Sequence, residues 1–111
     1  MAVGITTHVL DTSRGRPAEG VPILLHVWEN GWHPAGRSVT DADGRAKDLL
    51  AIPLRKGVWK ITFDLATWFG GQGIEAFYPE AVITFHVRDA GQHYHVPLLL
   101  SPFGYSTYRG S

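Results

Sequence analysis

The chain closes with YHVPLLLSPFGYSTYRGS, residues 94–111, and this stretch decides how the rest of the sequence is interpreted. It predicts one strand, a tight corner at Ser-Pro-Phe-Gly, and a second strand that runs to the carboxyl terminus. Chain ends are normally where order is lost, and disordered tails are poor in aromatic residues. Because aromatic residues continue to Tyr108, we expect this end to be packed, with His95 the first residue to consider for a chemical role.

The segments before this end predict further strands. Residues 58–65 and 81–87 alternate between apolar and polar residues, as half-buried strands do. Residues 21–28 are apolar on both faces except at one histidine, which predicts a strand covered on both sides. A weakly marked strand over residues 32–40 contains a proline, so we expect it at a sheet edge.

Turn-forming residues separate these strands from two further segments, residues 2–10 and 47–54, whose strand patterns are weaker. Residues 2–10 are rich in β-forming residues, and residues 11–20 contain the polar side chains, glycines and proline of a long turn. Asn30-Gly31 and Asp41–Gly44 are hairpin signals, and residues 47–54 predict a short strand. Because tight hairpins join antiparallel neighbours, these signals favour an antiparallel sheet.

The sequence allows one helix at most, over residues 65–73. Asp64 or Thr67 can cap its start, and three glycines near its end keep it short. Seven or eight short strands with one short helix predict an all-β fold, an antiparallel β-sandwich. No internal repeat or linker is present, so we expect residues 1–111 to form a single domain.

Composition excludes several classes of function. The 111 residues include ten basic and ten acidic side chains, which argues against a nucleic-acid surface and a basic membrane patch. Cysteine is absent, so disulfides and zinc–thiolate sites are excluded. The first residues do not resemble a secretory signal, and no apolar run approaches the ~20 residues of a membrane helix. We therefore expect a soluble, cytoplasmic protein.

His93 and His95 lie two apart on a predicted strand, so their imidazoles project from one face about 6.5–7 Å apart. The pair could be two ligands of a metal site, could supply a catalytic base, or could belong to an exposed polar face. A metal site needs a third ligand, and the sequence has no second motif with metal-ligand spacing. Metal binding therefore ranks below catalysis, and spacing alone favours the exposed face.

Three more residues could take part in chemistry, although each also has an ordinary structural interpretation. Arg45 follows the Asp41–Gly44 turn, and a guanidinium can bind a planar carbonyl or carboxylate, although a solvated arginine is commoner. His8 lies in an apolar strand, where a lone histidine is usually structural, yet imidazoles can transfer protons near neutral pH. Ser111 is the last residue and would ordinarily be inert. These residues by themselves leave the substrate open.

Two long motifs at opposite ends of the chain resemble signatures of the transthyretin family. HVLDTSRGRPA, residues 8–18, is similar to its amino-terminal signature, and YHVPLLLSPFGYS, residues 94–106, to its carboxyl-terminal signature. TDADGR at residues 40–45 and FYPE at residues 77–80 fall between them in the family's order. The resemblance covers essentially the whole chain and implies a transthyretin-like β-sandwich.

The family either carries thyroid hormone or hydrolyses 5-hydroxyisourate, and this chain resembles the hydrolase branch. The matching features are a histidine in each signature (His8 and His95), Arg45 after the central turn, and the Tyr-Arg-Gly-Ser ending of residues 108–111. The hormone carriers have lysine and threonine in place of the two histidines and lack Arg-Gly-Ser. The resemblance implies ring opening of 5-hydroxyisourate by water, to 2-oxo-4-hydroxy-4-carboxy-5-ureidoimidazoline, in urate breakdown.

The resemblance also implies a role for each residue, without a metal or an organic cofactor. His8 and His95 would hold the water, one of them as base, while Arg45 stabilises charge on the substrate carbonyl. Ser111 would orient water or substrate. The other substrate-binding residues would be Tyr108, Arg109 and Gly110. The implied assembly is a homotetramer, a dimer of dimers, with sites in the channel between the dimers. The alternative is a non-catalytic carrier that holds a flat hydrophobic ligand in such a channel.

Overall fold

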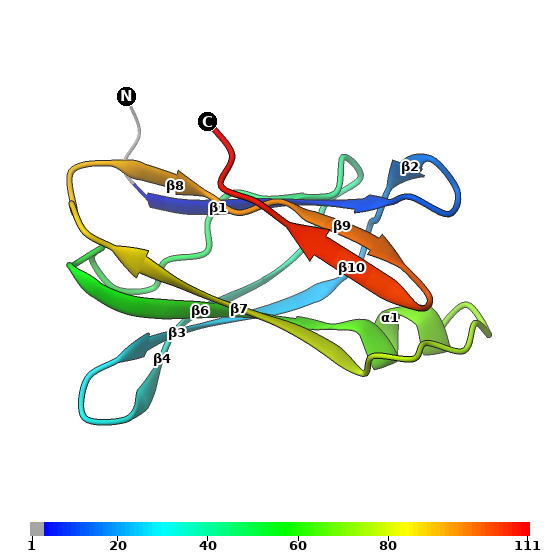
Figure 1. Ribbon diagram of the computed structural model, residues 1–111, viewed down its shortest axis with the longest axis horizontal. Coiled ribbons are helices and arrows are strands. Elements are labelled where there is room, and N and C mark those ends of the chain that lie inside the picture. The colour runs from blue at the N-terminus through cyan, green and yellow to red at the C-terminus, as the bar shows by residue number, and fades with distance from the viewer. Residues whose placement is uncertain (1–3) are drawn as a thin grey trace.

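Two β-sheets pack face to face, with one short helix at one end (Figure 1). The computed structural model describes residues 4–111, so the start of the strand predicted over residues 2–10 lies outside the described residues. The predicted all-β sandwich with one short helix is confirmed. In chain order the elements are β1 (Gly4–Asp11), β2 (Arg16–Pro17), β3 (Pro22–Trp28), β4 (Trp32–Val39), β5 (Arg45–Ala46), β6 (Gly57–Asp64), α1 (Leu65–Gly70), β7 (Glu80–Val87), β8 (His93–His95), β9 (Leu98–Ser101) and β10 (Gly104–Thr107).

The first sheet is built around β1. Its strands follow the order β10-β9-β1-β2, and β5 and β8 also pair with β1. β8 and β9 run parallel to β1, in contrast to the antiparallel neighbours that the hairpin signals predict. This parallel pairing sets the last strands of the chain beside the first one, as the blue and orange ribbons of Figure 1 show.

The second sheet follows the order β4-β3-β6-β7 and supplies much of the core. The predicted alternation of β6 is confirmed, because Trp59, Ile61 and Phe63 are fully buried and the residues between them are half-buried. Each such large apolar side chain contributes about 1.5–3 kcal/mol by leaving water. β4 lies at the sheet edge, as predicted, and Pro34 lies next to its register shift, where a missing N–H disturbs the ladder least.

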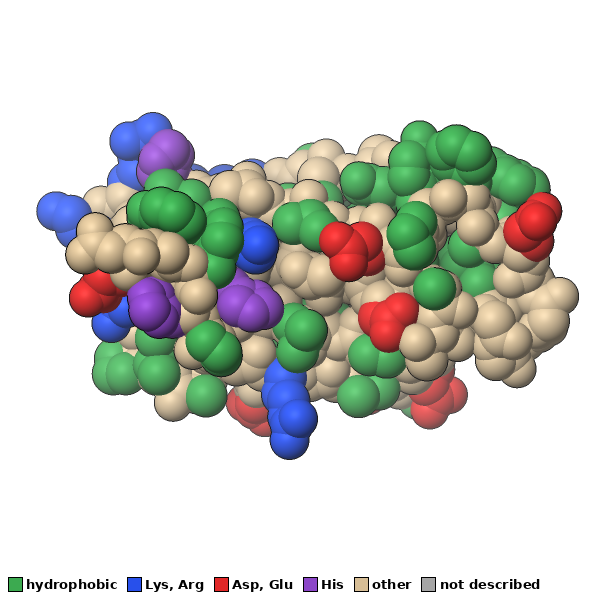
Figure 2. Space-filling model, turned by 90° about the horizontal axis from the view of Figure 1, so that it is seen from below, with side chains coloured by type: hydrophobic (Ala, Val, Ile, Leu, Met, Phe, Trp, Pro, Cys, Tyr) green, Lys and Arg blue, Asp and Glu red, His purple; other side chains and the backbone are tan. Residues whose placement is uncertain are grey.

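β3 is covered on one face only, so the prediction of a strand covered on both faces is wrong. Ile23, Leu25 and Val27 are buried in the core, whereas Leu24 and Trp28 are 47% and 50% exposed. The reason is that the second sheet packs against a single partner layer, which leaves the other face of its strands open. Figure 2 shows this open face, on which apolar side chains are mixed with histidines and charged residues.

Residues 47–54 do not form the predicted strand. In this part of the chain only the two residues of β5 pair with a strand, β1, and the chain then crosses from the first sheet to the second without regular structure. The crossing packs tightly on β4. The Ala51 N–H donates to the Ala35 carbonyl oxygen at 2.8 Å, and a Cβ added to Gly36 would lie 1.7 Å from the Leu49 carbonyl oxygen. A segment that spans the two layers in this way cannot stay paired with a strand of either.

The predicted closing strand is interrupted. β8 ends at His95 and β9 begins at Leu98, because Pro97 has no N–H for the ladder. Within residues 4–111, this break and the added strand β2 give ten strands in place of seven or eight. β10 ends at Thr107, short of the terminus to which the sequence predicts it to run. One bridge follows, in which the Gly110 N–H donates to the His95 carbonyl oxygen at 2.8 Å.

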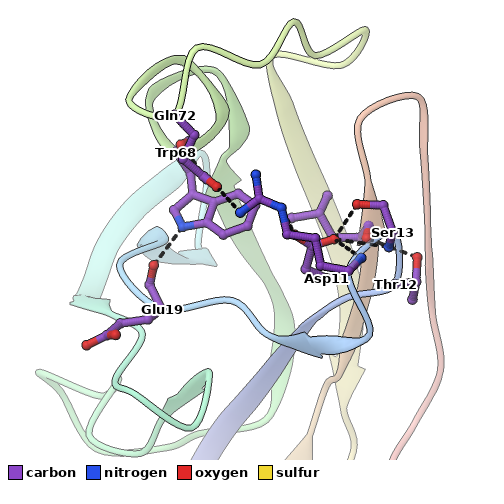
Figure 3. A network of polar contacts seen from close by, with 8 residues as sticks. Asp11, Thr12, Ser13, Glu19, Trp68 and Gln72 are labelled. Atoms are coloured by element: carbon purple, nitrogen blue, oxygen red, sulfur yellow. Dashed lines mark hydrogen bonds and ion pairs between the residues drawn. The ribbon is translucent and has the colours of Figure 1, made fainter.

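The helix α1 lies at the end of the sandwich opposite β8 (Figure 1). Asp64 caps it by accepting a hydrogen bond from the Thr67 N–H at 3.0 Å. The helix ends at Gly70, earlier than predicted, because glycine is a poor helix former. The Trp68 indole N–H donates to the Glu19 carbonyl oxygen at 2.6 Å and so ties the helix to the turn that follows β2 (Figure 3).

Candidate active site

Three strands bring the candidate residues to the outer face of the first sheet. Alternate residues of β1 are buried against the core, so Thr6 and His8 point outward. His8 is paired with Arg45 of β5 on one side of β1, and Thr6 is paired with His95 of β8 on the other. The pairing around β1 therefore joins residues that lie far apart in the sequence.

A hollow of about 280 Å³ opens on this face beside His95. Three of the four predicted catalytic residues, Arg45, His95 and Ser111, line it. His8 is not among the lining residues. It is the next outward residue after Thr6 along β1, and its Nε2 lies 2.8 Å from the Asp43 carbonyl oxygen. The complete lining is Thr6, Thr7, Arg45, Lys47, His93, His95 and Ser111.

The environment of His95 favours the neutral imidazole. Its Nδ1 lies 2.8 Å from the Thr6 hydroxyl oxygen, which lies at the same distance from Nε2 of His93. Partial burial lowers the pKa of His95 below its ordinary value, and the positive charge of Arg45, together with the charge that His8 and His93 carry when protonated, lowers it further. This environment favours the neutral form of His95 at pH 7, the state in which an imidazole can accept a proton.

The carboxyl-terminal residues divide between two hollows. Gly110 lies against the imidazole of His95, and Ser111 follows it into the hollow described above. Arg109 points elsewhere, with its guanidinium 4.8 Å from the centre of a tyrosine ring of β8. Tyr108 and Arg109 line a second, mainly apolar hollow of about 230 Å³. Within one chain, the fold brings Ser111 to the first hollow and sets Gly110 against the His95 ring, whereas Tyr108 and Arg109 line the second hollow.

Comparison with known proteins assigns the chain to a family. Residues 5–110 match the HIUase/transthyretin family. The chain belongs to this family. A probable 5-hydroxyisourate hydrolase of Caenorhabditis elegans is 44% identical over 112 residues, covering 96% of this chain and 81% of the relative.

Solved structures of the HIUase/transthyretin family share the backbone of this chain. The 5-hydroxyisourate hydrolase of Klebsiella pneumoniae has a TM-score of 0.86 and 39% identity, covering 96% of this chain and 98% of that one. Sea bream transthyretin in complex with thyroxine has a TM-score of 0.87 and 31% identity, covering 96% and 93%. Because the two TM-scores are so similar, the fold of the HIUase/transthyretin family does not by itself separate a hydrolase from a thyroxine-binding protein.

The hollow of this HIUase/transthyretin family member also contains residues that sequence reasoning did not select. Thr6 and Lys47 line it, although chemical roles were predicted only for their neighbours, and His93, which also lines it, was considered only together with His95. A signal was available, because each lies two residues from His8, Arg45 or His95. That spacing puts side chains on one face of a strand.

Residues 4–111 contain no preformed metal site. Among residues 4–111, no three His, Asp or Glu side chains are grouped so that they could hold a metal ion. The third ligand that a site at His93 and His95 would need is thus not supplied by these residues. Over the same range, no helix is long and apolar enough to cross a membrane.

Proposed function

We propose that the chain hydrolyses 5-hydroxyisourate in urate degradation, adding water to a ring amide to give 2-oxo-4-hydroxy-4-carboxy-5-ureidoimidazoline. The proposal depends on the hollow of the first sheet, which Arg45 lines from the middle of the chain and His95 and Ser111 line from its closing stretch. The identity of 44% to a probable 5-hydroxyisourate hydrolase and 39% to the Klebsiella pneumoniae enzyme supports it.

Ring opening needs a base that takes a proton from water and donors that stabilise the oxyanion. In the proposed mechanism His8 and His95 hold the attacking water, and one neutral imidazole of the pair is the base. The lowered pKa of His95, caused first by burial and then by the charge of Arg45, supports a neutral ring at pH 7.

Arg45 and Ser111 act on the substrate in this proposal. Both are exposed at the hollow, so a planar molecule can reach them. The Arg45 guanidinium binds the substrate carbonyls, best through two parallel hydrogen bonds, and stabilises the negative charge that develops there. Ser111 orients water or substrate through its hydroxyl or its terminal carboxylate. The remaining proposed substrate contacts are Tyr108, Arg109 and Gly110.

The proposed active form is a homotetramer, a dimer of dimers with sites in the channel between the dimers. The exposure of Arg45 and Ser111 supports it, because bulk water enters the hollow of a single chain freely. A second copy over this face would exclude that water and strengthen the electrostatic interactions of the site. We further propose that residues 1–111 act as one domain in the cytoplasm, without a metal or organic cofactor.

The second candidate function is carriage of a flat hydrophobic ligand without catalysis. The TM-score of 0.87 to sea bream transthyretin in complex with thyroxine favours it. The side chains of the hollow favour hydrolysis, because a site for such a ligand is lined mainly by apolar residues. Here the lining includes two imidazoles, a guanidinium and an ammonium group.

The decay of freshly generated 5-hydroxyisourate, followed by ultraviolet absorbance with and without protein, separates these functions. Acceleration that persists with a chelator supports the proposal. Tight binding of a flat hydrophobic ligand without acceleration would establish the carrier instead. Acceleration that a chelator abolishes would show that a metal ion takes part.

Substitutions at the hollow test which residues act. We expect His8→Ala, Arg45→Ala and His95→Ala each to lower the rate by about 10²–10³-fold while circular dichroism shows a folded chain. His33→Ala and Arg37→Ala are matched controls, because both lie on β4 of the other sheet. A folded variant at the hollow that keeps the wild-type rate removes that residue from the mechanism.

A further inference from the structure

One threonine hydroxyl joins two histidines at the proposed site. Thr6 lines the hollow from β1, and the parallel register sets it opposite His95, with His93 two residues earlier on β8. Its Oγ1 lies 2.8 Å from Nδ1 of His95 and 2.8 Å from Nε2 of His93. Both are hydrogen-bond distances, so the proton positions on the three groups depend on one another.

The hydroxyl has a single proton, which limits how the three groups can be connected. With both rings neutral, one ring N–H donates to Oγ1 of Thr6, and the hydroxyl donates to the other ring. If both rings donated to Oγ1, the hydroxyl proton would have no acceptor among residues 4–111. Two arrangements therefore remain, and they differ in which nitrogen of His93 and of His95 carries the proton.

The second nitrogen of His93 selects between the two arrangements. Its Nδ1 is buried and has no hydrogen-bond partner within the described range. Buried N–H groups without an acceptor are rare in proteins, whereas acceptors with an unused lone pair are better tolerated. His93 therefore carries its proton on Nε2 and donates it to Thr6, and Thr6 donates to Nδ1 of His95.

We infer that Thr6 and His93 are positioning residues that hold His95 as a neutral imidazole with its proton on Nε2. Nε2 of His95 makes no hydrogen bond to any other part of residues 4–111, so it can donate to a molecule bound beside the ring, which lines the hollow. The inference rests on the proposed function, in which that acceptor is the substrate oxygen that becomes the oxyanion. A neutral imidazole is an effective donor for such an oxygen.

The hydrogen bond of His8 identifies this residue as the base. Its Nε2 lies 2.8 Å from the Asp43 carbonyl oxygen, which can only accept, so the neutral ring has its lone pair on Nδ1. Nδ1 of His8 takes a proton from water as the water oxygen bonds to the carbonyl carbon. The carbonyl electron pair moves to oxygen, where His95 and Arg45 stabilise it. The proton then passes from His8 to the leaving ring nitrogen as the carbon–nitrogen bond breaks.

Long-range 1H–15N NMR correlation on the full chain tests the assignment, because the two neutral tautomers of a histidine give different patterns. We expect wild-type His95 to carry its proton on Nε2 only. Thr6→Val should show both tautomers, since it removes the group that distinguishes the ring nitrogens, and Thr6→Ser should restore the wild-type pattern. A wild-type His95 protonated on Nδ1 would overturn the inference.

Turnover of 5-hydroxyisourate gives a second readout. Thr6→Val should lower kcat about 10- to 100-fold with little change in KM, because a misplaced or wrongly protonated donor affects the transition state more than binding. Thr6→Ser should keep the wild-type kcat. So should the matched control Thr62→Val, because Thr62 is also half-buried but lies on β6 of the other sheet.

His93 supplies an independent pair of variants. His93→Phe removes the donor to Thr6 and should lower kcat, whereas His93→Gln retains an N–H donor and should recover part of it. Wild-type kcat in folded Thr6→Val and His93→Phe proteins would overturn the positioning role. A wild type that does not accelerate 5-hydroxyisourate decay would refute the proposed function instead, and the NMR pattern would still decide the tautomer of His95.

Discussion

Gly110→Ala should disable the site without unfolding the chain. A Cβ at this position would lie 2.5 Å from Cδ2 and 3.2 Å from Cγ of the His95 imidazole. Ordinary contacts of a Cβ begin at 3.4 Å. The φ angle of Gly110 is not among the positive values that favour glycine, so the backbone there accepts alanine. The effect of the substitution is therefore steric, and it acts on His95.

The size of the effect follows from these distances. The new methyl group requires a displacement of about 0.9 Å, the difference between 3.4 Å and 2.5 Å. Pro97 closes one direction of escape, because its Cγ would lie 3.3 Å from the same Cβ. Either the His95 ring or the terminal segment that ends at Ser111 must therefore move. A misplacement of about 1 Å costs about 10²-fold in rate, or about 2.7 kcal/mol of transition-state stabilisation.

Initial rates of 5-hydroxyisourate loss give kcat and KM, and urea denaturation gives the free energy of unfolding. Gly70→Ala is the matched control, because Gly70 is the last residue of α1 and has open space around its Cβ position. It should keep the wild-type rate and raise the free energy of unfolding by up to about 1 kcal/mol. Wild-type kcat in a folded Gly110→Ala protein would show that Gly110 does not set the position of His95.

Two further predictions concern stability. Asp64→Ala removes the cap that accepts from the Thr67 N–H at 3.0 Å and should lower the free energy of unfolding by about 1 kcal/mol in urea, with turnover unchanged. No loss would mean that packing alone holds the helix. Burial is the main cause that lowers the pKa of His95 in the folded chain. Between that pKa and about 6.5, the unfolded chain therefore binds more protons than the folded chain does. The free energy of unfolding should therefore rise with pH across this window, and the same slope in His95→Gln would contradict the prediction.

The segments that sequence reasoning predicted well are those whose environment is uniform along the strand. In β6, one face is buried, so apolar residues recur at every second position, at Trp59, Ile61 and Phe63. Residues 47–54 were predicted wrongly because their apolar residues, including the buried Leu49, pack at a crossing between layers. Apolar content reports burial there, but it does not report whether a pairing partner is within reach.

In β3, the apolar sequence predicts more burial than the structure has. Leu24 and Trp28 are apolar, yet both are about half exposed in the single chain, at 47% and 50%. An apolar residue in a strand predicts that something covers it, whereas its actual exposure depends on how many layers the fold stacks. The sequence could not supply that number.

The strands with regular alternation, the Asn30-Gly31 hairpin and the short helix were readable from the sequence, because periodicity and turn chemistry are local properties. The predicted turn at Asp41–Gly44 also forms, but it joins β4 of one sheet to β5 of the other and is therefore not a hairpin. The sequence also selected His8, Arg45, His95 and Ser111, since the motifs around them resemble one branch of a known family. Their mutual arrangement was not readable, because lateral strand order depends on which buried faces pack together.

The surroundings of His95 depend on contacts between distant parts of the chain. Parallel pairing of β1 with β8 sets the Thr6 hydroxyl 2.8 Å from His93 and from His95, although 87 and 89 positions separate them in the chain. The bridge to Gly110 closes the other side of His95 and directs Ser111 into the hollow. Each contact results from register between strands distant in sequence, which the packing of the whole sandwich sets and no local pattern encodes.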